Sequence, residues 1–71
     1  MWTMQRRGHR ARCALIARAG EWELRVLVDG VLMLTKWCER AADSFSIAET
    51  WKHRMLKDGW RQVVPKAARA A

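Results

Sequence analysis

The sequence predicts a small α+β domain: an antiparallel β-meander of about three strands packed on one C-terminal helix, with a short final strand. Two runs of β-forming residues, 22–28 and 31–38, flank the pair Asp29-Gly30 and predict the sheet. Apolar residues then recur at helical spacing between about 40 and 58, which predicts the helix. With 71 residues, the chain has room for one domain of this kind.

The Asp29-Gly30 pair predicts a two-residue hairpin, because a type I′ turn needs a positive φ at both central residues. A regular hairpin around this turn sets which residues face each other across the two strands. The expected pairs are Val28–Val31, Val26–Met33, Leu24–Thr35 and Trp22–Trp37 on one face, and Leu27–Leu32, Arg25–Leu34 and Glu23–Lys36 on the other. The first face is expected to be buried, which leaves Leu27, Leu32 and Leu34 on the outer face of the sheet.

Two further strands are predicted on either side of these elements. Residues 12–18 predict an upstream strand, with Ala19-Gly20-Glu21 as its turn into the hairpin. Residues 61–64 predict a short last strand, ended by Pro65 and lying at a sheet edge.

The helix is expected over about 40–58. Its predicted apolar stripe comprises Ala41, Phe45, Ala48, Trp51, Met55 and Leu56, and its polar face comprises Ser46, Glu49, Thr50, His53 and Lys57. A shorter helix is the alternative, because Ser46 and Glu49 fit a capping box. Gly59 suits the left-handed position after the last turn, with Trp60 making the hydrophobic contact that accompanies it.

Positive charge is concentrated toward the two ends of the sequence. The formal net charge is +7, and residues 1–12 contribute Arg6, Arg7, Arg10 and Arg12 with no acid. Residues 66–71 add Lys66 and Arg69, so the eight bases and seven acids of residues 13–65 leave only +1 there. The predicted division is a disordered basic arm at 1–11, one domain at 12–65 and a disordered basic tail at 66–71.

Two interpretations of these charged ends stay open. They are solvated segments that keep a small protein soluble, or they bind nucleic-acid phosphates weakly and without sequence preference. In the second interpretation the candidate phosphate contacts are Arg6, Arg7, Arg10 and Arg12.

Residues 22–65 resemble a class of short, uncharacterised bacterial proteins. In that class a W-E-L-R strand, a D-G hairpin and an aliphatic second strand precede one helix that closes with G-W. The matching residues are Trp22, Glu23, Leu24, Arg25, Asp29, Gly30, Trp37, Trp51, Gly59 and Trp60. The resemblance covers a little under two-thirds of the chain and implies a bacterial protein of unknown function; it carries no catalytic or binding residues over to this chain.

Residues able to bind metal or act as nucleophiles are few and scattered. His9, Cys13, Cys38 and His53 could in principle form a zinc set, but no pair has the close C-x₂₋₄-C spacing of structural sites. We therefore expect no metal and no cofactor. Cys38 with His53 is the only nucleophile–base pair to consider, so we expect no enzymatic activity. A Cys13–Cys38 disulfide stays open as an alternative to two free thiols.

The tryptophans and the outer leucines bear on function. Trp22 and Trp37 share their predicted face with aliphatic residues, which favours core packing over base stacking. Leu27, Leu32 and Leu34 predict an exposed apolar face, which favours a homodimer or another protein partner. The expected function is a self-associating protein-interaction module; the alternative is a nucleic-acid-binding accessory protein that uses the basic arm. No apolar run approaches the ~20 residues of a membrane span and no signal peptide is recognisable, so a cytoplasmic protein without membrane contact is expected.

Overall fold

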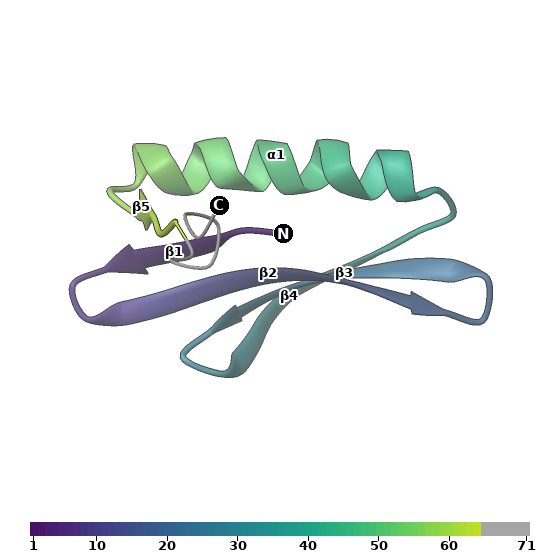
Figure 1. Ribbon diagram of the computed structural model, residues 1–71, viewed down its shortest axis with the longest axis horizontal. Coiled ribbons are helices and arrows are strands. Elements are labelled where there is room, and N and C mark those ends of the chain that lie inside the picture. The colour runs from purple at the N-terminus through teal and green to yellow at the C-terminus, as the bar shows by residue number, and fades with distance from the viewer. Residues whose placement is uncertain (65–71) are drawn as a thin grey trace, which may run out of the picture.

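The computed structural model describes residues 1–64 and shows one antiparallel sheet covered on one face by a helix (Figure 1). The elements are β1 Thr3–Arg6, β2 His9–Arg18, β3 Glu21–Val28, β4 Val31–Cys38, α1 Ala41–Lys57 and β5 Arg61–Gln62. The strand order is β4-β3-β2-β1-β5, so the α+β class and the meander followed by a helix are confirmed. The expectations for Pro65 and for the tail at 66–71 lie outside the described residues.

The helix connects the two edges of the sheet. β4 is one edge, and the chain runs from its end along α1 to β5, which pairs with β1 at the other edge. The core lies between α1 and the sheet, and its buried members are Trp2, Met4, Ala11, Cys13, Leu24, Val26 and Ala48. The face of the sheet away from α1 is called the outer face below.

The N-terminal residues are part of the sheet, so the expected disordered arm at 1–11 is wrong. β1 pairs with β2 along its whole length, and Trp2 and Met4 are buried. The connecting turn has φ 48° at Arg7 and 80° at Gly8, the same conformation as the predicted Asp-Gly turn. The sequence does carry the alternation of a half-buried strand from Trp2 to Gln5, but the arginines around it obscure the pattern.

A β-bulge in β4 overturns part of the predicted hairpin register. The first two pairs after the turn are as predicted, but Met33 is then left without a partner. Each later residue of β4 therefore lies on the face opposite to the predicted one. The pairs beyond the bulge are Val26–Leu34, Arg25–Thr35, Leu24–Lys36, Glu23–Trp37 and Trp22–Cys38. The bulge brings Cys38 into the buried layer just before α1 and turns Trp37 to the outer face.

The helix begins at Ala41, so the longer of the two predicted helices is confirmed and the start at Ser46 is wrong. Its predicted polar face is also confirmed, since all five residues assigned to it are exposed. Within residues 1–64, no helix has the length and apolar character needed to cross a membrane.

The buried face of α1 is rotated away from the predicted stripe. Ser44 and Ala48 are buried, whereas Phe45 and Leu56 are exposed and were wrongly assigned to the core. Trp2 gives the physical reason, because its indole Nε1 donates a hydrogen bond to the Ala48 carbonyl oxygen at 3.0 Å. Only small side chains fit where an indole lies against a helix, so the large Phe45 lies at the flank.

The end of α1 follows the prediction. Gly59 has φ 95°, and the N–H groups of Gly59 and Trp60 donate to the carbonyl oxygens of Leu56 and Met55, as in a Schellman motif. Trp60 packs against the core, which is the hydrophobic contact expected of it. The predicted last strand is confirmed at the sheet edge, where β5 pairs with β1, but it spans only Arg61–Gln62 of the expected 61–64.

Candidate functional site

The four candidate metal ligands are spread over the fold. His9 lies next to the β1–β2 turn, with its Nδ1 2.6 Å from Asp29 Oδ2. Cys13 is buried in β2, Cys38 ends β4, and His53 is exposed on the polar face of α1. Among residues 1–64, no three His, Cys, Asp or Glu side chains are grouped closely enough to hold a metal ion.

The two cysteines are free, buried thiols. Cys13 pairs with Val26 and Cys38 with Trp22, so they lie two strands and four residues apart, too far for a disulfide. Burial raises the pKa of the Cys13 thiol to about 11, which keeps it protonated and unreactive at neutral pH. His53 lies about 18 Å along α1 from the first helical residue, so it is not placed to act as a base for Cys38.

A buried carboxylate network lies on the outer face near the β2–β3 turn. Glu23 is 5% exposed, and its Oε1 lies 2.9 Å from Arg25 Nη2 and 3.9 Å from Arg18 Nε. The Thr35 hydroxyl donates a hydrogen bond to Glu23 Oε2 at 3.1 Å. The hydrogen bond from Arg25, assisted by the one from Thr35, lowers the pKa of Glu23. The predicted Glu23–Lys36 pair is wrong, because the bulge turns Lys36 toward the helix side of the sheet.

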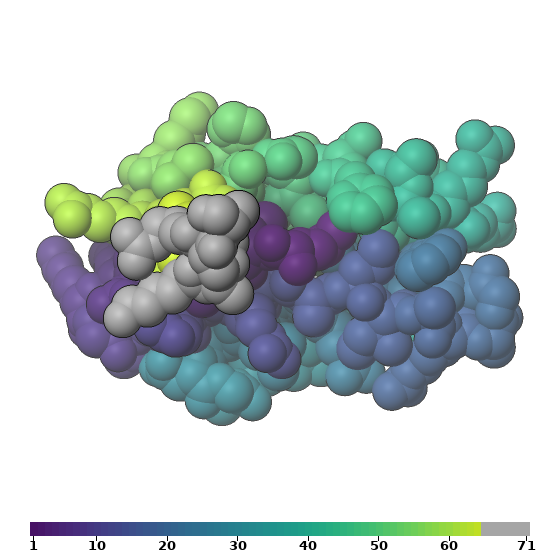
Figure 2. Space-filling view, in the orientation of Figure 1, coloured from purple at the N-terminus to yellow at the C-terminus, as the bar shows by residue number. Residues whose placement is uncertain are grey.

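Strand β4 is an exposed, apolar edge. All seven residues from Val31 to Trp37 are exposed, and only one side of β4 has a strand partner among residues 1–64. Figure 2 shows the beginning of β4 on the lower rim of the molecule, on the side away from α1. The name β4 edge is used for its five large apolar side chains, which are 48–60% exposed: Val31, Leu32, Met33, Leu34 and Trp37.

The three leucines predicted as a dimer face do not share one face of the sheet. Leu32 lies on the outer face, opposite the half-buried Leu27 of β3. Leu34 lies on the helix side, because it follows the bulge and pairs with the buried Val26. Exposed apolar surface therefore wraps around the β4 edge instead of covering the outer face.

The four arginines predicted as phosphate contacts all belong to the β1–β2 hairpin. Arg6 ends β1, Arg7 lies in the turn, and Arg10 and Arg12 follow on the outer face of β2. Arg61 joins them from β5, where it pairs with Gln5, the β1 residue that also pairs with Arg10. These five side chains are called the arginine surface: Arg6, Arg7, Arg10, Arg12 and Arg61.

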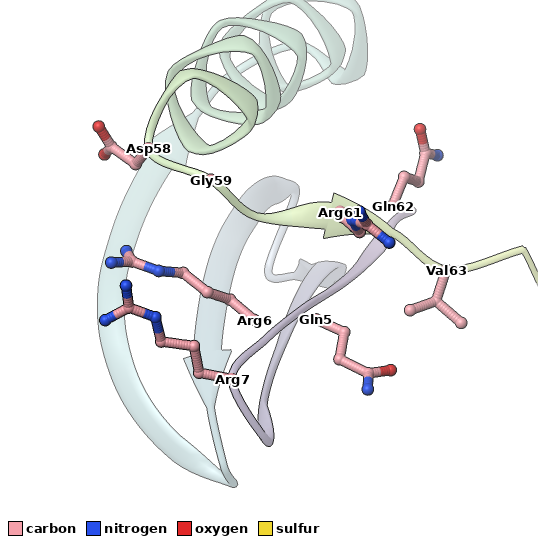
Figure 3. A pocket seen from close by; sticks show the side chains of 8 residues that line it. All are labelled: Gln5, Arg6, Arg7, Asp58, Gly59, Arg61, Gln62 and Val63. Atoms are coloured by element: carbon pink, nitrogen blue, oxygen red, sulfur yellow. The ribbon is translucent and has the colours of Figure 1, made fainter.

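Two grooves follow the arginine surface. The larger, of about 590 Å³, is lined by three arginines, two glutamines and one acid, namely Arg6, Arg7, Arg61, Gln5, Gln62 and Asp58 (Figure 3). Figure 3 shows Arg6 and Arg7 extending in the same direction below the end of α1, with the Asp58 carboxylate directed away from them. The smaller groove, of about 340 Å³, is lined by Arg10 and Arg12 beside the Asp29-Gly30 turn.

The arginine surface has no ion-pair partner within residues 1–64. The nearby Asp29 is engaged elsewhere, because it accepts hydrogen bonds from the Arg10 backbone N–H at 2.9 Å and from His9. Those two hydrogen bonds, the backbone one first, lower the pKa of Asp29. Arg10, Arg12 and Arg61 lie on the outer face, Arg6 lies toward the helix side and Arg7 lies in the turn between them, so the five guanidinium groups wrap around the β1–β2 hairpin and attract anions. The four positive charges of residues 1–12 thus belong to the folded domain and not to an arm outside it.

Sequence reasoning missed Arg61 and the two glutamines of the larger groove, Gln5 and Gln62. β5 and β1 are far apart in sequence, and no local pattern indicates that they pair. The alternation of residues 2–5 was the available signal for placing Gln5 on a strand beside the arginines.

Comparison of the chain with known protein families, with curated proteins and with solved structures finds no match. The resemblance to short bacterial proteins therefore stays a prediction. The chemistry of the β4 edge and of the arginine surface is the remaining basis for assigning a function.

Proposed function

We propose that the protein is a non-enzymatic, self-associating module in which β4 pairs with β4 of a second copy. The observation that supports this most directly is the run of seven exposed residues along a sheet edge. Edge strands present unpaired backbone N–H and C=O groups, and proteins usually keep them short, charged or covered. A long, apolar, uncovered edge is the kind of surface that takes a partner.

A second copy suits the β4 edge because the edge is complementary to itself. Two β4 strands related by a two-fold axis run antiparallel, so each can supply the backbone partners that the other lacks. Lys36 is the only charged residue of β4 and lies toward its end, so an axis near the middle of the strand keeps the two lysines apart. The apolar side chains of the two copies then cover each other, and the two sheets become one.

The outer face is a weaker candidate for the same contact. It carries Glu23, Arg25 and Arg18 near the β2–β3 turn, and charged groups are costly to remove from water. Two features of β4 do oppose pairing, since a bulge and a lysine are both found on protected edges. Met33 nevertheless keeps an exposed apolar side chain, and Lys36 is a single charge beside five apolar residues.

We also propose a cytoplasmic location and a bacterial source for the protein. A cytoplasmic location is supported by the two free, buried cysteines, because reducing compartments keep thiols unpaired. A bacterial source rests on the resemblance of residues 22–65 described above.

Analytical ultracentrifugation across the micromolar range tests the proposal. We expect a species of twice the 8.3 kDa chain mass that dissociates on dilution. Met33→Lys adds a charge to the β4 edge at the one residue without a ladder partner, so the variant should be a folded monomer by sedimentation and circular dichroism.

Phe45→Lys is the matched control. Phe45 is 56% exposed, close to the 60% of Met33, but it lies on the flank of α1 near Met1 and Gln62 rather than near β4. This variant should dimerise as the parent does. A parent protein that is monomeric at every concentration, or equal dissociation of both variants, would overturn the proposal.

A further inference from the structure

We infer that the arginine surface binds a single strand of nucleic acid through its phosphates. This inference is independent of self-association, because its five arginines lie on β1, β2, β5 and the β1–β2 turn and none lies on β4. Two distant parts of the chain contribute the five arginines. The β1–β2 hairpin at the start of the chain carries four of them, and β5, which follows the helix, carries Arg61.

The larger groove has the composition of a phosphate site. Arg6 and Arg7 from the hairpin and Arg61 from β5 line it, against one acid, Asp58 (Figure 3). Guanidinium groups match phosphate oxygens with paired N–H donors, and they remain charged at any physiological pH. Gln5 and Gln62 also line the groove, but their amides extend to opposite sides of β1 and β5, away from Arg6 and Arg7 (Figure 3).

The cationic surface continues beyond this groove along the outer face. Arg61, Gln5 and Arg10 form one row across β5, β1 and β2. Arg12 is two residues further along β2 on the same face, which places its Cα about 7 Å from that of Arg10. Arg10 and Arg12 line the smaller groove, so an extended polyanion can contact different arginines with successive phosphates. A single small anion would use only one of these grooves.

An aromatic side chain borders the same surface. A third hollow, of about 270 Å³, is lined by Arg6, Arg7, His9 and the half-buried Trp60. Proteins that hold single strands combine a basic groove with aromatic side chains on which unpaired bases stack. A duplex keeps its bases stacked inside, away from such a side chain. Trp60 therefore favours a single strand over a duplex.

The end of α1 lies beside the larger groove and carries partial negative charge, which opposes an anion. Its last carbonyl groups already accept hydrogen bonds from the N–H groups of Asp58, Gly59 and Trp60. Arg6 lies closest to this helix end, with its Nε 3.9 Å from the position that a Cβ on Gly59 would take. The charge of Arg6 thus offsets the partial negative charge at the end of α1, so Arg7 and Arg61 remain to bind the phosphates of the strand.

Fluorescence anisotropy of a labelled oligothymidine, titrated with the full chain at increasing salt, tests the inference. The parent should bind at low salt, with an affinity that falls steeply as salt rises. Arg7→Gln with Arg61→Gln should weaken binding about tenfold at low salt. The plot of log affinity against log salt should become less steep, with the magnitude of its slope reduced by roughly 0.7 for each lost phosphate contact.

The matched control is Arg54→Gln with Lys57→Gln. It removes the same charge from the last turn of α1, outside the grooves, and should change the affinity less than about twofold. Equal weakening by both double variants would mean that net charge alone attracts the strand, and would overturn the site.

A competition assay distinguishes binding of a single nucleic-acid strand from binding of other ligands that carry phosphate. Thymidine monophosphate, a duplex of the same length and vesicles containing anionic phospholipid should each compete more weakly than unlabelled oligothymidine. The inference fails if any of the three competes equally well, or if oligothymidine does not bind at low salt.

Discussion

Trp2 ties the start of the chain to the middle of α1. It is 6% exposed, and its indole N–H is bonded to the Ala48 carbonyl oxygen. Large aromatic side chains dominate the energetics of small cores, and this one anchors β1 beneath the helix. β1 in turn carries Arg6 and the hairpin that presents Arg7. The placement of one indole therefore decides whether the arginines belong to a surface or to an arm.

Trp2→Ala should lower the free energy of unfolding by about 3–5 kcal/mol, because it removes a buried aromatic side chain and leaves a cavity. Trp2→Phe keeps most of the ring and loses only the hydrogen bond, so its cost should be smaller. Urea unfolding followed by circular dichroism measures both. If the free energy of unfolding of both variants stays within about 0.5 kcal/mol of that of the parent, Trp2 does not pack in the folded domain.

Ser44 is fully buried in α1, and its hydroxyl has no hydrogen-bond partner among residues 1–64. Ser44→Ala removes this unsatisfied group and introduces a better helix former, so the free energy of unfolding should rise by about 1 kcal/mol. Thermal unfolding of the parent and the variant at equal concentration checks the sign. A loss of stability would show that the hydroxyl is bonded in solution.

Glu23 predicts a pH dependence of stability. Its pKa in the folded protein lies below the ordinary 4.5, chiefly because of the hydrogen bond from Arg25. A lowered pKa stabilises the fold at pH values above the unfolded pKa, and that contribution disappears as the pH falls through the folded pKa. Glu23→Gln should therefore be less stable than the parent at neutral pH, and the two should converge below pH 4.5. Urea midpoints over a pH series measure this, and a difference independent of pH would contradict it.

Among the elements, β4 departs most from its regular form. The unpartnered Met33 shifts the rest of the strand by one residue, which turns Thr35 to the outer face where it bonds Glu23. The same shift buries Cys38 where the chain leaves the sheet for α1. The extra residue Met33 therefore lets the start of β4 follow the two-residue turn, while the end of the strand places Thr35 beside Glu23 and Cys38 in the buried layer.

Deleting Met33 should leave the fold intact, because every other pair of the β3–β4 ladder can form without it. The free energy of unfolding should stay close to that of the parent, because the bulge residue is outside the ladder. In the bulge-free register, the same deletion would move every later residue of β4 to the wrong face and unfold the domain. Urea unfolding of the deletion variant separates the two registers, with Leu24→Ala as a control that must destabilise in either case.

At the scale of the whole molecule, the two edges of the sheet differ in chemistry. The β4 edge is apolar, while the β1–β5 edge carries Arg6 and Arg61. Two copies joined through β4 would leave both arginine surfaces outside the β4–β4 contact, because none of the five arginines lies on β4. Self-association and strand binding are therefore compatible in one assembly, although neither requires the other.

Self-association makes the thermal midpoint depend on concentration, because only the folded chain pairs through β4. A tenfold increase in chain concentration should raise the midpoint of the parent by a few degrees. Met33→Lys should show a midpoint that does not change with concentration. Scanning calorimetry of both proteins provides the measurement, and parallel behaviour would contradict the assignment to β4.

The accuracy of the sequence-based predictions depended on the range of the interactions involved. The Asp29-Gly30 turn and the Schellman end at Gly59 were predictable, because each depends on the dihedral angles of a few adjacent residues. The rotation of α1 was not predictable, because it depends on Trp2, which is remote in sequence. Of the arginine surface, four members were identified from charge, but Arg61 was found only through the pairing of β5 with β1.

The sequence by itself determined the α+β class, the meander and the helix that follows it, since these arise from local turns and from the periodicity of apolar residues. Only the tertiary structure decided that residues 1–11 join the sheet, which face each later residue of β4 occupies, and which edge β5 extends. Those choices depend on contacts between distant segments competing for one small core, and local propensity does not encode that competition. They are also the choices that form the arginine surface and leave the β4 edge uncovered.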